Sequence, residues 1–324
     1  MPAIEAIDRA DPEALAVFDA VIDVRSPSEF AEDHVPGAVN LPVLDDAERA
    51  RVGTIYVQDS PFRARRIGAA LVARNVAHHL ETALADKPGG FRPLVYCWRG
   101  GQRSGSMATI LANVGWRTTV LAGGYKTYRR HVQTRLYEDA LALRLVLLAG
   151  RTGSGKTQLL TALAARGVQT LDLEALAEHR GSVFGDLGHP QPSQKLFESR
   201  LLAALERLDP ARPVIVEAEA SKIGDRMAPP MLWKAMTAAP RIVLTVPAAV
   251  RARHLATQYA HVVADRAAFE AALARPRRHA RPRGARRRPH RNPLRPRLRP
   301  RRPQGGPPAT AGEPRPDRSR AGGP

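Results

Sequence analysis

The chain of 324 residues has one cysteine, six lysines and no long apolar run. A single cysteine excludes an internal disulfide, a four-thiolate metal site and a dithiol redox pair within the chain. No apolar stretch approaches membrane length, and residues 1–15 lack the apolar core of a signal peptide. We therefore expect a cytoplasmic protein with no membrane partner.

The positive charge is concentrated near the C-terminus. Residues 275–324 hold 17 arginines and two acidic residues, a net +15 of the total +19, which leaves +4 for residues 1–274. This Arg/Pro-rich tail has no apolar period, so it is predicted to be disordered. Arginine outnumbers lysine 44 to 6, as in a GC-rich gene. Out-of-frame translation of such a gene explains the tail better than a basic arm selected to bind RNA.

Short apolar strands alternate with helical segments along the rest of the chain. The alternation predicts two α/β domains in tandem, over residues 1–136 and 137–274, each with a parallel sheet. A helix is expected over residues 104–115. The expected strands are residues 21–26, 93–97, 143–150, 168–173, 213–219 and 241–247, with a further short one within 34–42.

The cysteine lies in YCWRGGQRS, residues 96–104, between an expected strand and an expected helix. A thiol reacts as its thiolate, and positive charge or a helix N-terminus lowers its pKa. The glycines let backbone N–H groups turn inward, so the loop predicts a reactive Cys97 beside an anion site. A buried core cysteine is the alternative. The expected anion-binding residues are Arg99, Gly100, Gly101 and Arg103.

GRTGSGKT, residues 150–157, matches the pattern G-x-x-x-x-G-K-[ST] between an apolar strand and a helix. Backbone N–H groups of such a loop surround phosphate oxygens, the lysine neutralises them, and the hydroxyl can coordinate Mg²⁺. The motif predicts phosphate binding without identifying the phosphate. The expected loop residues are Gly150, Thr152, Gly153, Ser154, Gly155, Lys156 and Thr157.

Two further places carry candidate residues for this site. Glu217 ends an apolar strand, where an acidic partner of Mg²⁺ or water is expected. Asp172 and Glu174 form a second candidate pair, although Asp172 equally suits the cap of a helix. Residues 179–188 combine a histidine, an arginine and three glycines, and form either a substrate lid or an ordinary surface loop.

The segment GGYKTYRRHVQTR, residues 123–135, is the best RNA-binding candidate outside the tail. Lys126, Arg129 and Arg130 are expected to contact phosphates, with Tyr125 and Tyr128 able to stack on bases. A solvated basic helix that joins the two domains is the alternative.

The segment DVRSPSEFAEDHVPGAVNLP, residues 23–42, together with the cysteine loop, resembles a rhodanese domain, whose loop cysteine carries a transferable sulfur. The resemblance implies mostly structural roles around the site for Asp23, Arg25, His34, Pro36, Gly37 and Asn40.

From about Ile22 to about Tyr259 the chain resembles the tRNA 2-selenouridine synthase family. The resemblance rests on CWRGGQRS, GGYKTYRRHV, TGSGKTQLL, DLEALAEHRGSVFG, QPSQKLFE and VEAEASKIG, in this order. The tail departs from the family, because the family's further helical stretch and terminal motif are missing there.

This resemblance implies a tRNA partner that carries 2-thiouridine at the wobble position, U34. A geranyl group is first transferred from geranyl diphosphate to the sulfur, and selenium from selenophosphate then replaces the geranylated sulfur. Cys97 would carry the selenium as a perselenide, and residues 150–157 would hold the diphosphate. The resemblance implies two co-substrates, selenophosphate and geranyl diphosphate, and no tightly bound cofactor. Whether Mg²⁺ is required is left open.

Three other functions compete with this interpretation. A rhodanese-type sulfurtransferase with an accessory nucleotide-binding domain would use the same Cys97, but it gives the phosphate loop no role in the reaction. A small-molecule or nucleoside kinase with an inactive rhodanese module would leave the cysteine loop unexplained. A basic RNA-binding protein would depend on the tail alone.

Overall fold

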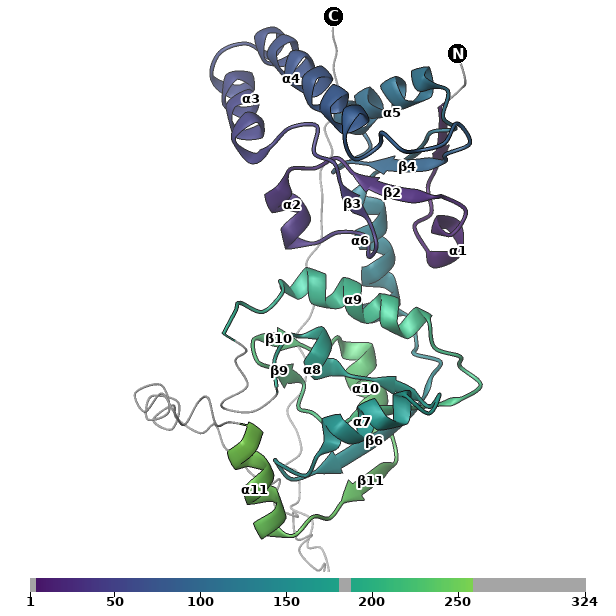
Figure 1. The fold of residues 1–324 in the computed structure, drawn as a ribbon, viewed down its shortest axis with the longest axis vertical. Helices are drawn as coiled ribbons and strands as arrows, with labels where there is room; N and C mark the ends of the chain where they lie inside the picture. Colours follow the sequence, from purple (N-terminus) through teal and green to yellow (C-terminus); the bar gives the residue numbers. More distant parts are fainter. Residues whose placement is uncertain (1–3, 181–187, 259–324) are drawn as a thin grey trace, which may run out of the picture. The chain divides into compact units, whose positions relative to one another are not determined.

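A computed structural model of the protein describes residues 4–180 and 188–258. Its fold contains two parallel sheets with helices packed against them (Figure 1). Most of the expected lid at 179–188, and the whole basic tail at 275–324, lie outside the described residues, so both stay predictions.

The first sheet has five parallel strands in the order β1-β5-β4-β2-β3. They are β1 (Glu5–Ile7), β2 (Ala20–Asp23), β3 (Val39–Asn40), β4 (Pro93–Tyr96) and β5 (Thr119–Leu121). Every residue of β4 is buried, as expected for a central strand of a parallel sheet. The helices are α1 (Pro12–Leu15), α2 (Pro27–Glu32), α3 (Asp46–Gln58), α4 (Pro61–Glu81), α5 (Gln102–Val114) and α6 (Tyr125–Gln133), which continues into a π-helical turn, Thr134–Glu138.

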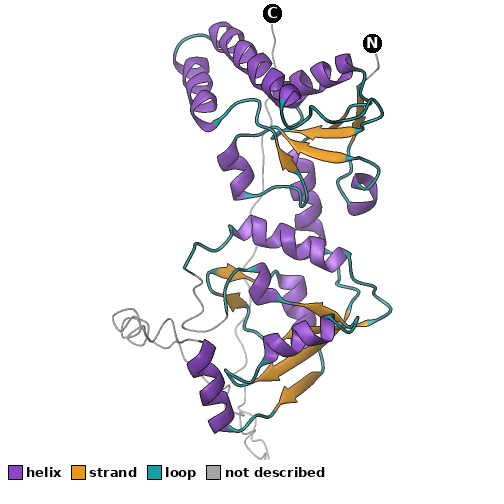
Figure 2. Ribbon diagram, viewed as in Figure 1, coloured by secondary structure: helices purple, strands orange, loops and turns teal. Residues whose placement is uncertain are grey.

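The second sheet has four parallel strands in the order β11-β6-β8-β7. They are β6 (Arg144–Gly150), β7 (Gln169–Leu171), β8 (Pro213–Glu217) and β11 (Arg241–Leu244), and β9 (Lys222–Ile223) pairs separately with β10 (Arg226–Met227). The helices are α7 (Lys156–Ala164), α8 (Leu173–Leu176), α9 (Gln194–Glu206), α10 (Pro230–Ala238) and α11 (Ala248–Gln258). Figure 2 shows these helices and strands by colour.

The long helices α3 and α4 follow β3 and precede β4 in the chain, and they pack against each other. Asp45 begins α3 with a capping box, in which its carboxylate accepts from the N–H of Glu48 at 2.7 Å and the Glu48 carboxylate accepts in return at 3.0 Å. Ser60 and Pro61 begin α4. Sequence reasoning missed this pair, because α3 fully buries none of its side chains and so carries a weak apolar period.

The predicted fold class is confirmed in both α/β regions. The helix expected at 104–115 is α5, and the expected strands are present in shortened form. The division between residues 136 and 137 stays a prediction. It falls within the π-helical turn, whose Leu136 packs in the same hydrophobic cluster as side chains from both sheets.

Two hydrophobic clusters stabilise the described residues. One contains Cys97 with side chains of β2, α4 and α5. The other joins β4 and α6 to β6, β8 and α9, so α6 contributes Tyr125, Tyr128 and Val132 to a core that also belongs to the second sheet. Cys97 is therefore buried within this core, as the alternative of a buried core cysteine has it, although it also begins the loop that leads to α5.

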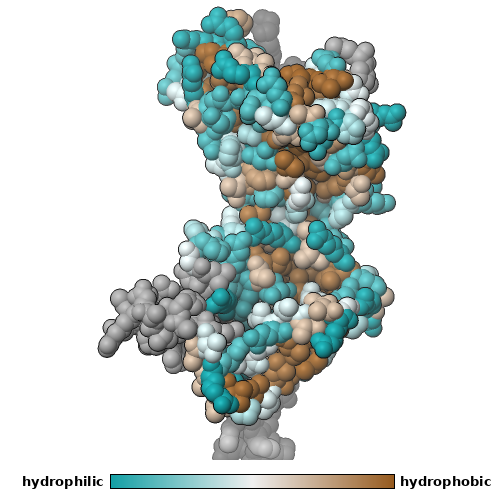
Figure 3. Space-filling model, viewed as in Figure 1, coloured by the Kyte–Doolittle hydropathy of each residue, from teal (hydrophilic) through white to brown (hydrophobic). Residues whose placement is uncertain are grey.

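Within residues 4–180 and 188–258, no helix is both long and apolar enough to cross a membrane. Hydrophilic residues are interspersed with hydrophobic ones over the face seen in Figure 3.

Candidate functional site

The thiol of Cys97 lies at the C-terminal end of β4, immediately before α5. Its Sγ accepts hydrogen bonds from the backbone N–H of Gly101 at 3.3 Å and from Oγ of Ser104 at 3.2 Å. Burial alone would raise the pKa of this thiol, which is 3% exposed, but hydrogen bonds from Ser104 and from the backbone N–H groups of Arg99 and Gly101 lower it. The loop therefore stabilises a thiolate.

A second glycine turn holds the cysteine loop in place. The N–H of Tyr125 donates to the carbonyl of Cys97 at 2.8 Å, and the N–H of Lys126 donates to that of Trp98 at 3.3 Å. Gly124 makes this approach possible, since it has φ +59° and a Cβ there would collide with the carbonyl oxygen of Cys97. Sequence reasoning treated this segment as an RNA patch and missed its contact with the thiol loop.

The arginines of the loop have different surroundings. Arg99 is exposed. The guanidinium of Arg103 forms an ion pair with Glu29 of α2 at 2.7 Å, and Glu29 also pairs with Arg49 at 3.1 Å. Burial raises the pKa of Glu29, but its hydrogen bonds and ion pairs, above all those with Arg103, lower the pKa by more than burial raises it. The carboxylate is therefore charged and fixes the position of Arg103.

The residues assigned structural roles lie beneath the site. Arg25 is buried and donates two hydrogen bonds to the carboxylate of Asp23, at 2.6 and 3.0 Å, and its guanidinium lies 4.1 Å from the ring centre of Tyr125. Asn40 donates to the carbonyls of Asp23 and Arg25, both at 2.9 Å. His34 contacts the carbonyl of Phe30 at 2.8 Å. These contacts agree with roles in positioning strand ends and not in chemistry.

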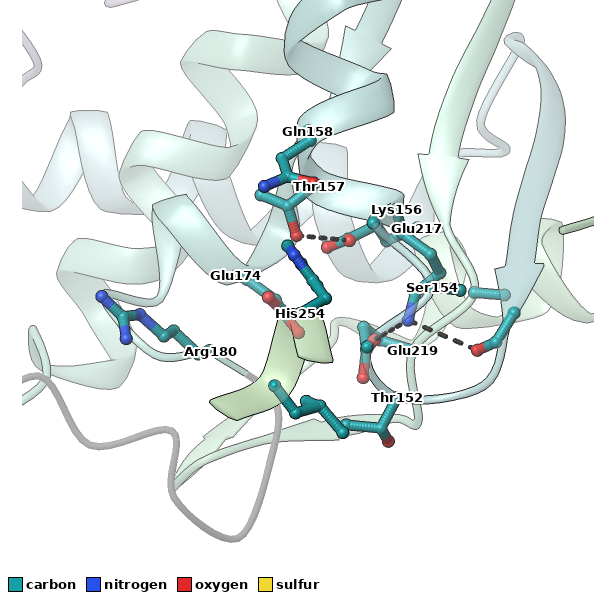
Figure 4. A pocket seen from close by; sticks show the side chains of 15 residues that line it. Thr152, Ser154, Lys156, Thr157, Gln158, Glu174, Arg180, Glu217, Glu219 and His254 are labelled. Carbon is teal, nitrogen blue, oxygen red and sulfur yellow. Dashed lines mark hydrogen bonds and ion pairs between the residues drawn. The ribbon is translucent and has the colours of Figure 1, made fainter. Parts of the chain in front are cut away.

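The phosphate loop connects β6 to α7. Gly153 and Gly155 both have φ +80°, which favours glycine. Lys156 points back across the loop, with Nζ 3.5 Å from the carbonyl oxygen of Gly150 and 4.0 Å from the carboxylate of Glu219. The predicted loop residues line a pocket of about 340 Å³ (Figure 4).

Three carboxylates face this loop. The side chains of Glu174, Glu217 and Glu219 each offer an oxygen within 4.8 Å of the others, and all three line the pocket (Figure 4). The hydroxyl of Thr157 donates to Oε1 of Glu217 at 3.0 Å, whereas Oε2 of Glu217 is buried without a hydrogen-bond partner. Buried oxygens of this kind, next to a threonine hydroxyl, fit a Mg²⁺ site formed by Thr157 and Glu217.

The pKa values of two carboxylates in the cluster are raised. Burial, and then the nearby Asp172, raises the pKa of Glu217 to about 7. Burial, followed by the charges of Glu217 and Glu219, raises the pKa of Glu174 to about 8. Crowded carboxylates beside a phosphate pocket repel both one another and the phosphate unless protons or a divalent cation neutralise them.

Asp172 and Glu174, the second pair of candidates, have different roles. Asp172 caps α8 by accepting from the N–H of Ala175 at 2.8 Å, while Glu174 faces the pocket. Glu219, Arg180 and His254 also line the pocket. Arg180 belongs to the segment 179–188 that the sequence offers as a substrate lid, whereas sequence reasoning missed Glu219 and His254 as site residues. The alternation Glu217-Ala218-Glu219 was the available signal, because alternate residues of an extended segment point to the same side.

The expected RNA patch needs correction. Tyr125 and Tyr128 are buried and are not available to stack on bases. Arg129 is paired with Glu198 and lies 3.9 Å from Asp33, so its guanidinium serves contacts inside the protein. Lys126 and Arg130 are exposed, and their contact with RNA stays a prediction.

The same helix links the two α/β regions. Glu198, on α9, is buried and accepts hydrogen bonds from Arg129 and from the hydroxyl of Tyr137, the latter at 2.6 Å. His131 contacts Glu206 at 2.9 Å. Contacts between α2 and α9 add a salt bridge of Lys195 with Glu32 at 2.6 Å.

Two family models match different parts of the chain. Residues 5–131 match the rhodanese-like domain family, and residues 143–277 match the tRNA 2-selenouridine synthase AAA domain family. The tRNA 2-selenouridine synthases of Nitrosomonas europaea, Bdellovibrio bacteriovorus and Psychromonas ingrahamii are 37%, 35% and 33% identical to the chain. These similarities cover 77%, 74% and 76% of this chain, and 66%, 64% and 66% of the three relatives.

The fold and the two loops thus define a rhodanese-like thiol domain joined to a P-loop domain of the AAA type. The chain belongs to the tRNA 2-selenouridine synthase family. It spans slightly less than two thirds of the length of the three relatives.

Proposed function

We propose that the protein converts 2-thiouridine at the wobble position of tRNA to 2-selenouridine. The observation that carries this proposal is the position of the only thiol of the chain, whose Sγ accepts two hydrogen bonds in a loop with an oriented arginine. The phosphate pocket of the same chain supplies a second site, as a two-step conversion requires. The family to which the chain belongs carries the name of this activity.

The first step is S-geranylation at the phosphate loop. The amides of residues 150–157 and the ammonium of Lys156 bind the diphosphate of geranyl diphosphate. Thr157 and Glu217 would hold Mg²⁺, whose charge would neutralise the departing diphosphate. The thiouridine sulfur forms a bond to the geranyl carbon as the carbon–oxygen bond to diphosphate breaks. No nucleotide hydrolysis is needed, which favours geranyl diphosphate over ATP as the ligand of this loop.

The second step is selenation at the thiol loop. A thiocarbonyl carbon has no good leaving group, whereas S-alkylation makes C2 electrophilic and lets it expel a thiol. Selenophosphate is an anion, and the loop offers it the N–H groups around Cys97 together with Arg99 and Arg103. Selenium attacks C2, and the geranyl thiol leaves.

Mass spectrometry of nucleosides tests both steps. Thiouridine tRNA is incubated with geranyl diphosphate and selenophosphate and either the wild-type protein, Cys97→Ala or Lys156→Ala. We expect selenouridine from the wild type, a nucleoside that has passed the geranylation step but is not selenouridine from Cys97→Ala, and unchanged thiouridine from Lys156→Ala. Lys234→Ala, an exposed lysine on α10, is the matched control and should behave as the wild type.

The outcomes separate the two leading functions. Thiouridine left unchanged by the wild type would contradict the proposal. If the protein then transfers sulfur from thiosulfate in a Cys97-dependent reaction, the sulfurtransferase with an accessory nucleotide-binding domain becomes the better assignment.

A further inference from the structure

The chemistry of selenophosphate restricts what Cys97 can do, given the proposed function. Selenium in selenophosphate is already at the selenide level. If the thiolate attacked selenium, the electron pair of the P–Se bond would stay on phosphorus and the product would be phosphite. A perselenide together with phosphate requires a two-electron oxidant, and a chain with one cysteine has no second thiol for an internal disulfide to provide one. Attack on phosphorus needs no oxidant.

The loop has the parts that attack on phosphorus requires. Arg103 follows Cys97 with five residues between them, and α5 begins at Gln102, so the N-terminus of this helix lies next to the thiol, whose sulfur accepts the N–H of Gly101. The sulfur accepts hydrogen bonds from Oγ of Ser104 at 3.2 Å and from the N–H of Gly101 at 3.3 Å. Glu29 holds the guanidinium of Arg103 from α2, at 2.7 Å. Both terminal nitrogens of Arg103 donate to Glu29, at 2.7 and 3.4 Å, so the remaining N–H groups of its guanidinium are the ones available to the oxygens of a phosphoryl group.

We propose that Cys97 is a phosphoryl acceptor. After selenium has attacked C2 and the geranyl thiol has left, the base carries a Se-phosphoryl group. The Cys97 thiolate attacks phosphorus in line, an S–P bond forms, and the P–Se bond breaks with its electron pair on selenium. The selenide delocalises into the pyrimidine ring and takes up a proton. Water then attacks the phosphocysteine, releases inorganic phosphate and regenerates the thiolate, without any change of oxidation state.

This chemistry defines the class of substrate. A delocalised selenide is a weak base and leaves without a general acid. The site should therefore hydrolyse phosphate esters of acidic leaving groups, such as p-nitrophenyl phosphate, and leave alkyl phosphates untouched. That activity requires neither tRNA nor geranyl diphosphate, so it can be measured separately from the proposed function.

The test uses the full chain and p-nitrophenyl phosphate, with acid quenching and mass spectrometry of the peptide that contains Cys97. We expect turnover, a phosphate adduct on Cys97, and turnover at background level for Cys97→Ser. Ser104→Ala should be about tenfold slower, because it removes one hydrogen bond to the sulfur. Ser106→Ala, an exposed serine on the same helix, should match the wild type.

The result that overturns the inference is turnover that persists in Cys97→Ser, or no phosphate adduct on Cys97 in the wild type. Selenouridine synthesis is measured on the same preparations. Selenouridine without the adduct leaves the proposed function intact and removes the phosphoryl acceptor. The adduct without selenouridine supports the phosphoryl acceptor and contradicts the proposed function.

Discussion

At the scale of single residues, Gly124 shows how one glycine can determine the position of a thiol loop that is distant in sequence but adjacent in space. Glycine is required here for two separate reasons: φ is +59°, and there is no space for a Cβ beside the carbonyl of Cys97. At Gly37 only the first reason applies, since φ is +84° but no heavy atom lies within 4 Å of the position that a Cβ would take. The two glycines therefore form a natural pair for comparison.

Gly124→Ala should destabilise the protein more than Gly37→Ala. A left-handed alanine costs about 1–2 kcal/mol, which is the effect expected at Gly37. The added collision at Gly124 should bring the loss there to roughly 3 kcal/mol or more and displace the thiol loop. Urea denaturation measures the difference in free energy of unfolding, and equal losses at the two positions would contradict it.

Glu217 gives the protein a pH-dependent stability. Its pKa of about 7 in the folded state lies above the ordinary value of 4.5, so between these values the folded protein binds a proton that the unfolded chain has released. Stability is therefore greatest below pH 4.5 for this group and is lost as pH rises through about 7. Glu217→Gln should remove that dependence and stabilise the protein at pH 8 by roughly 1–3 kcal/mol.

Mg²⁺ provides the second part of this test. At pH 8 the ionised carboxylate should bind the cation, so Mg²⁺ should raise the free energy of unfolding of the wild type more than that of Glu217→Gln. Urea denaturation at pH 5.5 and pH 8, with and without Mg²⁺, measures both effects. Equal stabilisation of the two proteins would show that Glu217 is not a ligand.

At the scale of elements, the π-helical turn and α6 differ from the solvated basic helix that the sequence suggests. Arg129 has an exposed neighbour of the same type, Arg130, but it lies against the buried Glu198, which is 1% exposed. Removing one partner of a buried ion pair leaves an uncompensated charge. The charge of α6 therefore stabilises the contact with α9.

Arg129→Met should lower the free energy of unfolding by about 3–5 kcal/mol, because it leaves the carboxylate of Glu198 buried without its cation. Arg130→Met, the matched exposed variant, should change it by less than about 0.5 kcal/mol. Adding Glu198→Gln to Arg129→Met should recover part of the loss. Similar effects of the two arginine variants would mean that the pair contributes nothing to stability.

The same scale shows what the sequence can and cannot predict. The cysteine loop and the phosphate loop were predictable because each is a contiguous motif between a strand and a helix. The approach of Gly124 to Cys97, and the meeting of Glu174 with Glu217, depend on which strand ends lie side by side in a sheet. The pairing of β4 with β5 brings Gly124 to Cys97, the order β11-β6-β8-β7 brings Glu174 to Glu217, and no local pattern encodes either arrangement.

At the scale of the whole molecule, the two sites use separate sets of residues. The thiol site takes its groups from β4, α2, α5 and α6. The phosphate site takes its groups from β6, α7, α8, β8 and α11, and from residues next to these elements. Because neither site borrows a group from the other, a variant that disables one should leave the other chemically complete.

Two variants that are each inactive in selenouridine synthesis should therefore complement each other when mixed. Lys156→Ala retains the thiol loop and Cys97→Ala retains the phosphate loop, so tRNA geranylated by the second protein can be selenated by the first. We expect selenouridine from the mixture, at a rate that rises with the concentration of both proteins, as mass spectrometry of nucleosides would show. A modified nucleoside that accumulates without selenouridine would mean that the tRNA must pass between the two sites of one chain, and that the sites, although chemically separate, act as one.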